Sequence, residues 1–354
     1  MILAGDIGGT KTVLSLFEAS GDELRQIRET VFSSKDYDSL DEILKSFLKK
    51  VGSPPLRSAC LGVAGAVVDG KSKITNLPWR LDEKGIAEVI DVPRTKLLND
   101  LEAAAYGMLH LGKDELSELN RGAEPARQGN IAVIAAGTGL GEAMVLWDGE
   151  RHQVVASEGG HADFAPRSDE EIELLKYLRQ EYRGHVSYER VLSGPGIFNI
   201  YCFLRDAGYA PESDGVKEKL ESEDPGAVVS EAGLEGEDAL SVRTLELFSS
   251  IHGAEAGNLA LKCLAVGGVF VGGGIAPKVL KALKAGHFMK GFTDKGRFSD
   301  LVRSMRVSVV LNLRTPILGA AHYALRLGVS SIFTGMPKRS SAPACPPPIR
   351  IACA

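Results

Sequence analysis

Residues 5–12 read Gly5-Asp6-Ile7-Gly8-Gly9-Thr10-Lys11-Thr12 and lie between two short apolar segments, Ile2–Ala4 and Val13–Phe17. A buried strand, a glycine turn and a returning strand predict a β-hairpin. The backbone N–H groups of such a turn are free to hold phosphate oxygens, and the Thr10 hydroxyl adds another polar group. The turn is therefore a candidate phosphate site, with a simple tight hairpin as the alternative when the turn is taken alone.

Two common phosphate-binding motifs do not fit the glycine turns of this chain. A Walker A loop needs a glycine directly before Lys-Thr and a helix directly after it, but Thr10 precedes Lys11 and a strand pattern follows. The dinucleotide fingerprint fails at Gly137-Thr138-Gly139-Leu140-Gly141, because Glu142 stands where its third glycine belongs. Neither of these nucleotide-binding folds is expected.

The second half of the chain opens in the same way as the first. A buried strand is predicted at 131–136, the glycine turn follows at 137–141, and a returning strand is predicted at 143–147. The two openings form a weak internal repeat. A third glycine run, Gly272-Gly273-Gly274, lies between an apolar strand at 269–271 and a predicted helix. Strands alternate with helices elsewhere, so the sequence predicts the α/β class.

Composition limits the classes of protein to be considered. The chain has 354 residues, of which 44% are hydrophobic and 25% charged, as in a globular protein long enough for two domains or one divided by a cleft. Lys plus Arg total 41 against 46 Asp plus Glu, a net charge of −5, which offers no broad cationic surface for nucleic acid. The longest apolar run, residues 264–276, is shorter than the ~20 residues of a membrane span.

The N-terminus and the cysteines bear on the compartment. The first residues lack a basic segment followed by a hydrophobic one, so no secretory signal is expected and the cytoplasm is the predicted location. The cysteines are odd in number, widely spaced and never in a CxxC pair, which predicts reduced thiols at Cys60, Cys202, Cys263, Cys345 and Cys353.

A set of polar residues could bind hydroxyl groups. Asn99 and Asp100 lie where an apolar strand meets a helix, and Asn99 with Glu102 could equally form a capping box. Glu158 and His161 bracket two glycines, so both side chains can project from one tight loop. Carboxylates accept several hydrogen bonds and an imidazole can accept or donate, which suits the hydroxyls of a sugar.

The motifs together resemble a known family. Residues 5–10, 136–141 and 271–274 look like the phosphate-one, phosphate-two and adenosine motifs of the sugar kinase/actin superfamily. Within it, the order of Leu98-Asn99-Asp100, Ser157-Glu158-Gly159-Gly160-His161 and the stretch from Glu189 to Gly196 is similar to bacterial-type glucokinase, over about residues 2–328. The zinc motif of the related ROK family is absent, since Ala162-Asp163-Phe164-Ala165-Pro166 follows His161. Lys11 departs from the asparagine that is frequent after the threonine.

The resemblance implies a two-lobed actin-like ATPase (ribonuclease H-like) fold with a central cleft. We expect a small α/β domain formed by residues 1–111 plus 315–328, and a larger α+β domain formed by residues 112–314. Gly112–Gly129 is polar and is the expected hinge. Residues 335–354 hold five prolines and are expected to form a flexible tail. A homodimer is the family expectation.

The resemblance also implies an activity, the phosphorylation of glucose at its 6-hydroxyl with Mg-ATP. Asp100 would be the catalytic base, and it would bind the sugar together with Asn99, Glu158, His161 and Glu189. Asp6 would position Mg²⁺, with an Asx-type turn as the alternative role. The expected nucleotide-binding residues are Gly5, Asp6, Ile7, Gly8, Gly9, Thr10, Lys11, Gly137, Thr138, Gly139, Gly272, Gly273 and Gly274.

Three other functions remain open from the sequence. A kinase for another hexose or an N-acetylated amino sugar would share every motif. A sugar-responsive repressor would need a helix-turn-helix, for which no room is expected before Gly5. A non-catalytic sugar-binding module would be expected to lack the base, whereas Asp100 is present.

Overall fold

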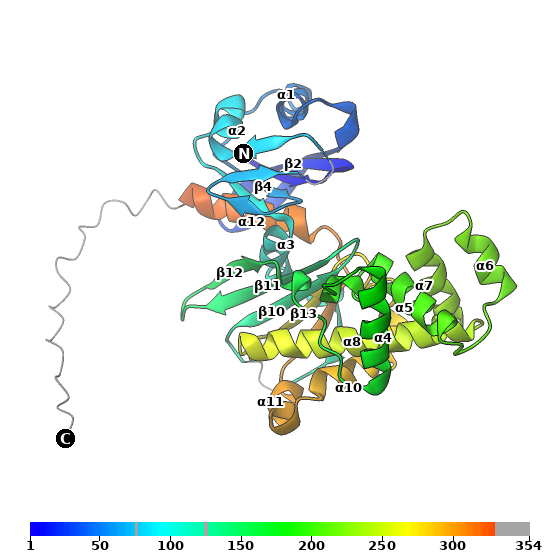
Figure 1. Ribbon diagram of the computed structural model, residues 1–354. Helices are drawn as coiled ribbons and strands as arrows, with labels where there is room; N and C mark the ends of the chain where they lie inside the picture. Colours follow the sequence, from blue (N-terminus) through cyan, green and yellow to red (C-terminus); the bar gives the residue numbers. More distant parts are fainter. Residues whose placement is uncertain (75–76, 124–126, 330–354) are drawn as a thin grey trace, which may run out of the picture.

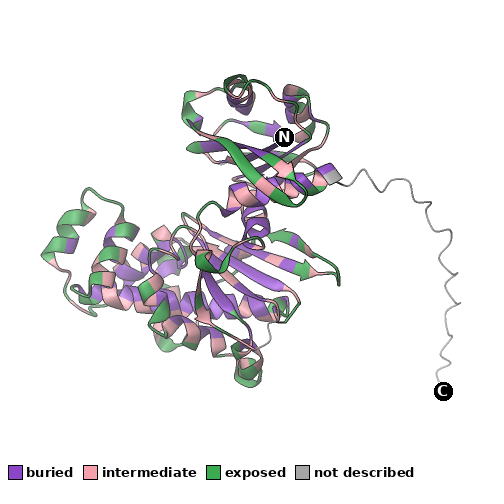
Figure 2. Cartoon of the chain, turned by 180° about the vertical axis from the view of Figure 1, so that it is seen from behind, coloured by how far each residue is buried: buried purple, intermediate pink, exposed green. Residues whose placement is uncertain are grey.

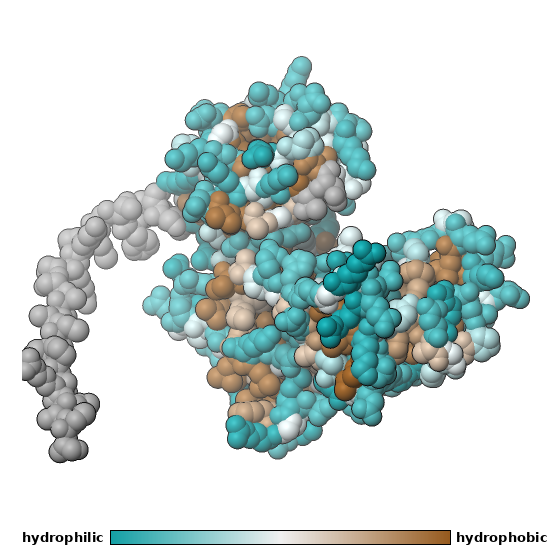
Figure 3. Space-filling view, viewed as in Figure 1, coloured by the Kyte–Doolittle hydropathy of each residue, from teal (hydrophilic) through white to brown (hydrophobic). Residues whose placement is uncertain are grey.

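The computed structural model describes residues 1–74, 77–123 and 127–329. The chain forms two lobes, each built on a mixed β-sheet, with helices between the sheets and around them (Figure 1). The space-filling view shows the surface hollowed between the lobes (Figure 3). The tail predicted at 335–354 lies outside the described residues.

The first sheet is built by the glycine hairpin and the strands that follow it. Its strand order is β3 (Glu23–Ser33), β2 (Lys11–Ser20), β1 (Ile2–Ile7), β4 (Ser58–Val63) and β8 (Thr95–Asn99). β1 to β3 run antiparallel, whereas β4 and β8 lie parallel to β1. One face packs against α1 (Leu40–Lys50) and α2 (Glu83–Ile90). Nearby lie η1 (Ser34–Asp36) and a small sheet of β5 (Val67–Val68), β6 (Lys71–Lys73) and β7 (Arg80–Asp82).

The second sheet repeats this strand arrangement. Its order is β12 (His152–Ser157), β11 (Leu140–Trp147), β10 (Ile131–Ala136), β13 (Gly268–Gly272), β14 (Val307–Val310) and β9 (Leu116–Asn120). The first three strands are again antiparallel neighbours, and the next two are again parallel to the central strand. The internal repeat predicted from the two glycine hairpins is therefore confirmed at the level of topology.

Helices cover the far face of the second sheet, and the long helix α8 (Ala239–Lys262) runs across it (Figure 1). The inner strands of both sheets, such as β1, β4, β10 and β13, are buried and purple, whereas the edge strands β3 and β12 are largely exposed (Figure 2). The other helices of this lobe are α4 (Asp169–Glu181), α5 (Gly194–Asp206), α6 (Asp214–Leu220), α7 (Pro225–Glu235), α9 (Leu280–Lys284), α10 (His287–Thr293), η5 (Gly296–Phe298) and α11 (Ser299–Arg303).

Two helices lie between the sheets and belong to one hydrophobic cluster with both of them. These are α3 (Asp100–Met108) and α12 (Thr315–Val329). Their backbones touch, because a Cβ added to Gly107 would lie 2.0 Å from the Thr315 carbonyl oxygen, and one added to Gly319 would lie 1.8 Å from that of Ala103. The Ser58 hydroxyl on β4 donates to the Ala324 carbonyl at 2.6 Å, which ties α12 to the first sheet.

Some predicted elements differ from the structure. Residues 112–129, predicted as a polar hinge, contain η2 (Lys113–Glu115) and the strand β9, which pairs with β14 and forms the edge of the second sheet. β3 and β12 were not predicted, because their exposed polar residues hide the strand pattern. By contrast, the acidic segment 215–236 is helical, as its sequence predicts, and forms the two short helices α6 and α7.

Within the described residues, no helix is both long and apolar enough to cross a membrane. Even α8, with 24 residues, carries Arg243, Glu246, Glu255 and Lys262. Of the predicted reduced thiols, Cys60, Cys202 and Cys263 are free, and Cys60 and Cys263 are buried. Cys345 and Cys353 lie outside the described part of the chain.

Candidate functional site

The two predicted glycine turns connect antiparallel strands at equivalent positions in the two sheets. In the first, the Gly8 N–H donates to the Lys11 carbonyl at 2.9 Å. In the second, the Gly137 N–H donates to the Gly139 carbonyl at 2.8 Å. Thr10 and Lys11 are exposed, as is Thr138 in the second turn. Both turns therefore present polar groups outward at the ends of buried strands, as a phosphate site requires.

Ser34 of η1 stabilises the first turn through hydrogen bonds to its carbonyl groups. Its hydroxyl donates to the Gly8 carbonyl at 2.8 Å, and its backbone N–H donates to the Thr10 carbonyl at 2.9 Å. Ser34 is fully buried and its hydroxyl also lies 2.9 Å from that of Thr12. These bonds fix the turn without using its outward N–H groups. Sequence reasoning missed Ser34, since a serine in a polar stretch carries no distinguishing signal.

The third glycine run lies beside the second turn. Gly273 has φ of +84°, and a Cβ there would lie 2.2 Å from the Ala136 carbonyl oxygen at the end of β10. The Ile275 N–H donates to the same carbonyl at 3.2 Å. Only glycine combines this backbone conformation with so close an approach. The structure therefore brings together the second and third runs, which are more than a hundred residues apart in the sequence.

The N-terminus of α5 also adjoins the second turn. The Gly194 N–H donates to the Gly137 carbonyl at 2.9 Å, and the Ser193 hydroxyl caps the helix by accepting from Gly196 N–H at 3.0 Å. A helix N-terminus carries a partial positive charge that favours a nearby phosphate. The sequence motif from Glu189 to Gly196 was predicted only as part of the sugar side.

Asp6 lies on β1 and Asp100 begins α3, and the two lie close enough for the charge of Asp100 to affect the ionisation of Asp6. Burial raises the pKa of Asp6 to about 6, the Asp100 charge adds to the rise, and Lys11 opposes it. Burial also raises the pKa of Asp100, with the Glu158 carboxylate adding to it and the hydrogen bond from Leu101 N–H opposing it. The structure thus places the predicted metal ligand, the predicted base and one predicted sugar ligand in a single acidic group.

Asn99 caps α3, as the alternative interpretation held. Its Oδ1 accepts from Leu101 N–H at 3.0 Å and from Glu102 N–H at 3.3 Å, and Glu102 accepts from the Asn99 backbone N–H. Its Nδ2 donates to the Gly65 carbonyl at 3.2 Å. An amide nitrogen has two protons, so one donor is left for a ligand. Capping and ligand binding are therefore compatible at this residue.

Glu158 begins the turn η3 (Gly159–His161), and both of its glycines are required by close contacts. A Cβ on Gly160 would lie 2.0 Å from the Leu140 carbonyl oxygen, and one on Gly159 would lie 2.3 Å from Oε2 of Glu142. The turn therefore packs closely against β11, while Glu158 and His161 remain exposed. The prediction that both side chains project from one tight loop agrees with this geometry.

Glu189 lies in η4 (Tyr188–Arg190) and touches the second glycine turn. Its Oε2 accepts from the Leu140 N–H at 3.0 Å, and a Cβ on Gly139 would lie 2.5 Å from the same oxygen. The predicted sugar ligand is therefore also a neighbour of the predicted phosphate turn. No sequence motif predicts this contact, because 49 residues separate the two partners.

The acidic group fits a magnesium ion. Within residues 1–74, 77–123 and 127–329, no set of three or more His, Cys, Asp and Glu side chains could hold a metal by itself. Magnesium keeps several waters and usually takes one or two carboxylates with phosphate oxygens, so Asp6 beside the first turn suffices. A cation there would also offset the burial and the Asp100 charge that together raise the pKa of Asp6.

Two sheets of one topology, three glycine runs at strand ends and an acidic group beside them define a sugar kinase of the actin-like ATPase fold. The glucokinase family model matches residues 3–327. The chain belongs to the glucokinase family, which confirms the family and the fold class expected from the motifs.

Known relatives are similar over nearly their whole length. The glucokinase of Nostoc punctiforme is 43% identical over 340 residues, covering 92% of this chain and 99% of the relative. Among solved structures, a glucokinase from an Antarctic psychrotroph is 32% identical with a TM-score of 0.80, covering 92% of this chain and 98% of that one. A Balamuthia mandrillaris glucokinase in complex with glucose is 24% identical with a TM-score of 0.75, covering 92% and 93%, and supports the fold.

Proposed function

We propose that this chain transfers the γ-phosphoryl group of Mg-ATP to the 6-hydroxyl of glucose, producing glucose 6-phosphate and ADP. The observation that carries the proposal is the position of Asp100, whose ionisation is affected by Glu158 and which itself affects Asp6. One carboxyl thus lies between the residues expected to bind sugar and the turn expected to bind phosphate. Membership of the glucokinase family supports the same reaction.

Asp100 is the general base of the proposed reaction. Its Oδ1 accepts from Leu101 N–H at 2.8 Å, which holds the carboxyl in place and leaves the other oxygen for the proton of the 6-hydroxyl. Burial raises its pKa, which makes the carboxylate a better proton acceptor than a fully solvated one. Phosphoryl transfer needs this acceptor only as the new bond forms, while the phosphate charge is stabilised elsewhere.

The sugar hydroxyls are bound by the remaining polar residues of this group. Glu158 and Glu189 accept hydrogen bonds, His161 accepts or donates one, and Asn99 donates one through the free proton of Nδ2. These residues come from α3, η3 and η4, so the sugar site forms only where the two lobes meet. A substrate with an inverted or missing hydroxyl leaves a charged acceptor without a partner, which gives specificity.

The three glycine runs bind the nucleotide. The N–H groups of residues 9–10 and 138–139 and the N-terminus of α5 hold the phosphates, and Gly272–Gly274 let the adenosine approach the backbone. Asp6 holds Mg²⁺, which when bound neutralises phosphate charge. Lys11 is exposed beside the first turn and adds a positive charge near the phosphates.

We propose that the two lobes are a domain of residues 1–111 with 315–328 and a domain of residues 112–314. The α3–α12 pair belongs to a core shared by both sheets and forms the joint about which the lobes close. Closure excludes water that would otherwise accept the phosphoryl group. Assembly as a homodimer and location in the cytoplasm are proposals that rest on family membership.

A panel of sugars assayed with Mg-ATP by coupled ADP release tests the proposal. Hydrogen bonds to charged groups contribute roughly 1.5–3 kcal/mol each, so the loss of two lowers kcat/KM by about 10²–10⁴-fold. We expect glucose to exceed galactose, fructose and N-acetylglucosamine by such factors. Equal or better rates with N-acetylglucosamine or fructose would reassign the substrate within the sugar kinases. If no sugar is phosphorylated, the proposal is wrong and the chain is a sugar-binding module.

A further inference from the structure

Glu142 is a buried carboxyl directly behind the sugar-binding turn, and the proposed reaction does not use it. It lies on β11, directly after the second glycine turn (residues 137–141), and is 2% exposed. Oε2 lies against the backbone of Gly159, and Oε1 makes no hydrogen bond to the described residues. A carboxylate buried without a hydrogen-bond partner would be strongly destabilising.

A second buried carboxyl, Glu255 of α8, lies near Glu142 and is 0% exposed. Unlike Glu142, Glu255 accepts several hydrogen bonds. Asn258 Nδ2 donates to it at 2.8 Å, Lys262 Nζ donates at 3.4 Å, and the Tyr188 hydroxyl donates to it as well. Glu255 therefore accepts several hydrogen bonds, whereas Oε1 of Glu142 accepts none from the described residues.

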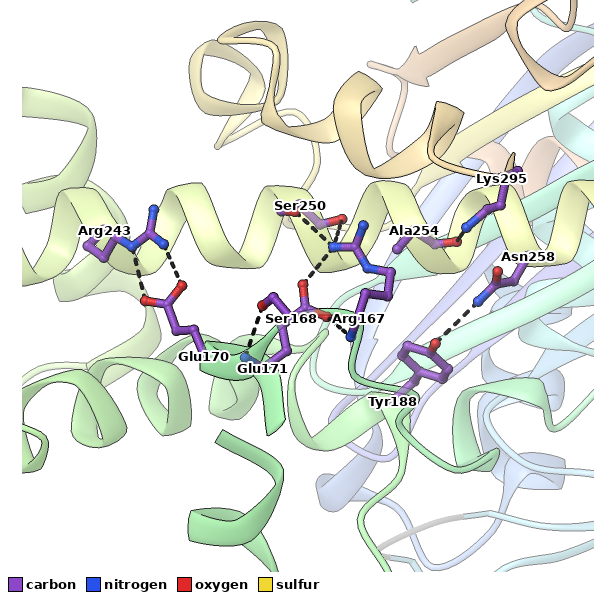
Figure 4. A network of polar contacts seen from close by, with 10 residues as sticks. All are labelled: Arg167, Ser168, Glu170, Glu171, Tyr188, Arg243, Ser250, Ala254, Asn258 and Lys295. Carbon is purple, nitrogen blue, oxygen red and sulfur yellow. Dashed lines mark hydrogen bonds and ion pairs between the residues drawn. The ribbon is translucent and has the colours of Figure 1, made fainter. Parts of the chain in front are cut away.

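The network around Glu255 reaches both sugar-binding segments. Tyr188 extends toward Asn258 on α8, and the amide of Asn258 donates to its hydroxyl at 3.3 Å (Figure 4). Tyr188 immediately precedes Glu189, and its N–H donates to the Ala162 carbonyl at 2.9 Å, just after His161. Glu142 meets the same turn at its other end, through Gly159 and through the Ser157 hydroxyl, which donates to the Glu142 carbonyl at 2.8 Å.

We propose that Glu142 is a positioning residue for sugar binding: its neutral side chain supports the turn of residues 158–161 from behind, and loss of its proton displaces that turn. The inference rests on the proposed function, because the turn matters through the sugar that it binds. The charged groups that act on Glu142 are Glu255 and Lys262 of α8. Tyr188 of η4 contacts Glu255, and the turn itself carries the titratable groups Glu158 and His161.

The electrostatics agree with a proton on Glu142 near neutral pH. Burial raises the pKa of Glu142 to about 7, the Glu255 charge adds to the rise, and Lys262 opposes it. Above that pH a second negative charge appears beside Glu255 in a site with little water. The repulsion between the two carboxylates then moves the Glu142 carboxylate, whose Oε2 contacts Gly159. The turn of residues 158–161 is displaced as a result.

Glucose affinity measured calorimetrically from pH 6 to pH 8 tests the inference. In the parent chain the Kd should rise with pH, by about three- to tenfold more than in Glu142→Gln, whose amide stays neutral. Asp6 and Asp100 titrate alike in both proteins, so the difference isolates Glu142. Glu142→Ala should weaken binding by about tenfold at every pH, because the turn loses its support.

Glu171→Gln is the matched control, since Glu171 is also a carboxyl at 3% exposure facing α8, but it pairs with Arg167 away from the sugar turn (Figure 4). It should keep the pH dependence of the parent. The inference is overturned if Glu142→Gln and the parent show the same pH dependence, or if Glu142→Ala binds normally while remaining folded by circular dichroism. The proposed function fails separately, if the parent binds glucose without phosphorylating it.

Discussion

Oε2 of Glu189 accepts a hydrogen bond from the backbone N–H of Leu140 at 3.0 Å, directly beside Gly139. A residue proposed to bind the sugar is thereby attached to the turn proposed to bind phosphate. A carboxylate has further lone pairs, so Glu189 can keep this bond while it accepts from a sugar hydroxyl. Any change that moves the carboxylate should therefore affect sugar and nucleotide binding together.

Gly139→Ala tests this relationship. The new Cβ would lie 2.5 Å from Oε2 of Glu189, so the carboxylate must move away and its bond to Leu140 is lost. We expect KM to rise for glucose as well as for ATP, by about three- to thirtyfold each, since hydrogen bonds to charged groups contribute roughly 1.5–3 kcal/mol and the side chain partly readjusts. Steady-state kinetics with each substrate varied in turn provide the measurement.

Gly137→Ala is the matched control for that experiment. A Cβ at Gly137 meets nothing within 4 Å, so Glu189 keeps its position. The added methyl group would occupy only the space proposed for phosphate, and KM should rise for ATP alone. The coupling through Glu189 would be refuted if both variants raised the KM of glucose equally.

Asp100→Asn removes the proposed base with little change in shape. Turnover should fall by roughly 10²–10⁴-fold, while glucose affinity changes much less, because an amide still makes most of the hydrogen bonds. Glu102→Gln is a suitable control, since Glu102 lies in the same first turn of α3 and has a pKa that burial also raises. Near-normal turnover in Asp100→Asn would show that another group accepts the proton.

Asp6→Asn should raise the stability of the ligand-free protein and weaken its function. The folded-state pKa of about 6 lies above the ordinary value of 3.8, so the folded chain holds this proton more tightly than the unfolded chain does. The stabilisation linked to that proton is present below pH 3.8 and is lost as the pH rises through 6. At pH 7 the ionised Asp6 therefore opposes folding of the ligand-free protein, and replacing it should raise Tm.

The same substitution should raise the Mg²⁺ concentration needed for half-maximal turnover, because a carboxylate ligand is lost. Differential scanning calorimetry at pH 5 and pH 7, together with a magnesium titration of activity, checks both effects. We expect the gain in Tm to be larger at pH 7 than at pH 5. A lower Tm at pH 7 with an unchanged magnesium requirement would contradict the proposed role of Asp6.

Local signals in the sequence were enough to predict most of the elements around the site. The glycine hairpins, the apolar strands and the helix that begins after Asn99 all depend on nearby residues, and the structure forms each of them. The strands β3 and β12 were missed because they lie at sheet edges, where exposed residues such as Arg25 and Gln153 give little alternation. Residues 116–120 form a strand only because β14, nearly 200 residues later, offers a free edge.

The contacts that unite the site depend on tertiary structure. Glu189 meets Leu140, and Glu142 lies near Glu255, across separations that no short motif encodes. Glu142 was noticed only as the residue that breaks a dinucleotide fingerprint, although a charged residue within an apolar strand is itself a signal of a special environment. The Glu255 charge that adds to its raised pKa lies on α8, which is too distant in sequence to be paired with it by pattern.

Closure of the lobes about the α3–α12 joint is the remaining prediction. The proposed sugar ligands Asn99 and Asp100 lie at the start of α3 and the others lie in or beside η3 and η4, so we expect closure to bring these elements together around glucose. Close contact at Gly107 and Gly319 lets the two helices pivot together without a side chain between them. Small-angle scattering should show a smaller radius of gyration with glucose and a non-hydrolysable ATP analogue than without ligands. Galactose at the same concentration should cause less compaction, because an inverted hydroxyl leaves one acceptor unpaired. An unchanged radius at saturating glucose and nucleotide would mean that the site is already closed, and that water is excluded by the ligands alone.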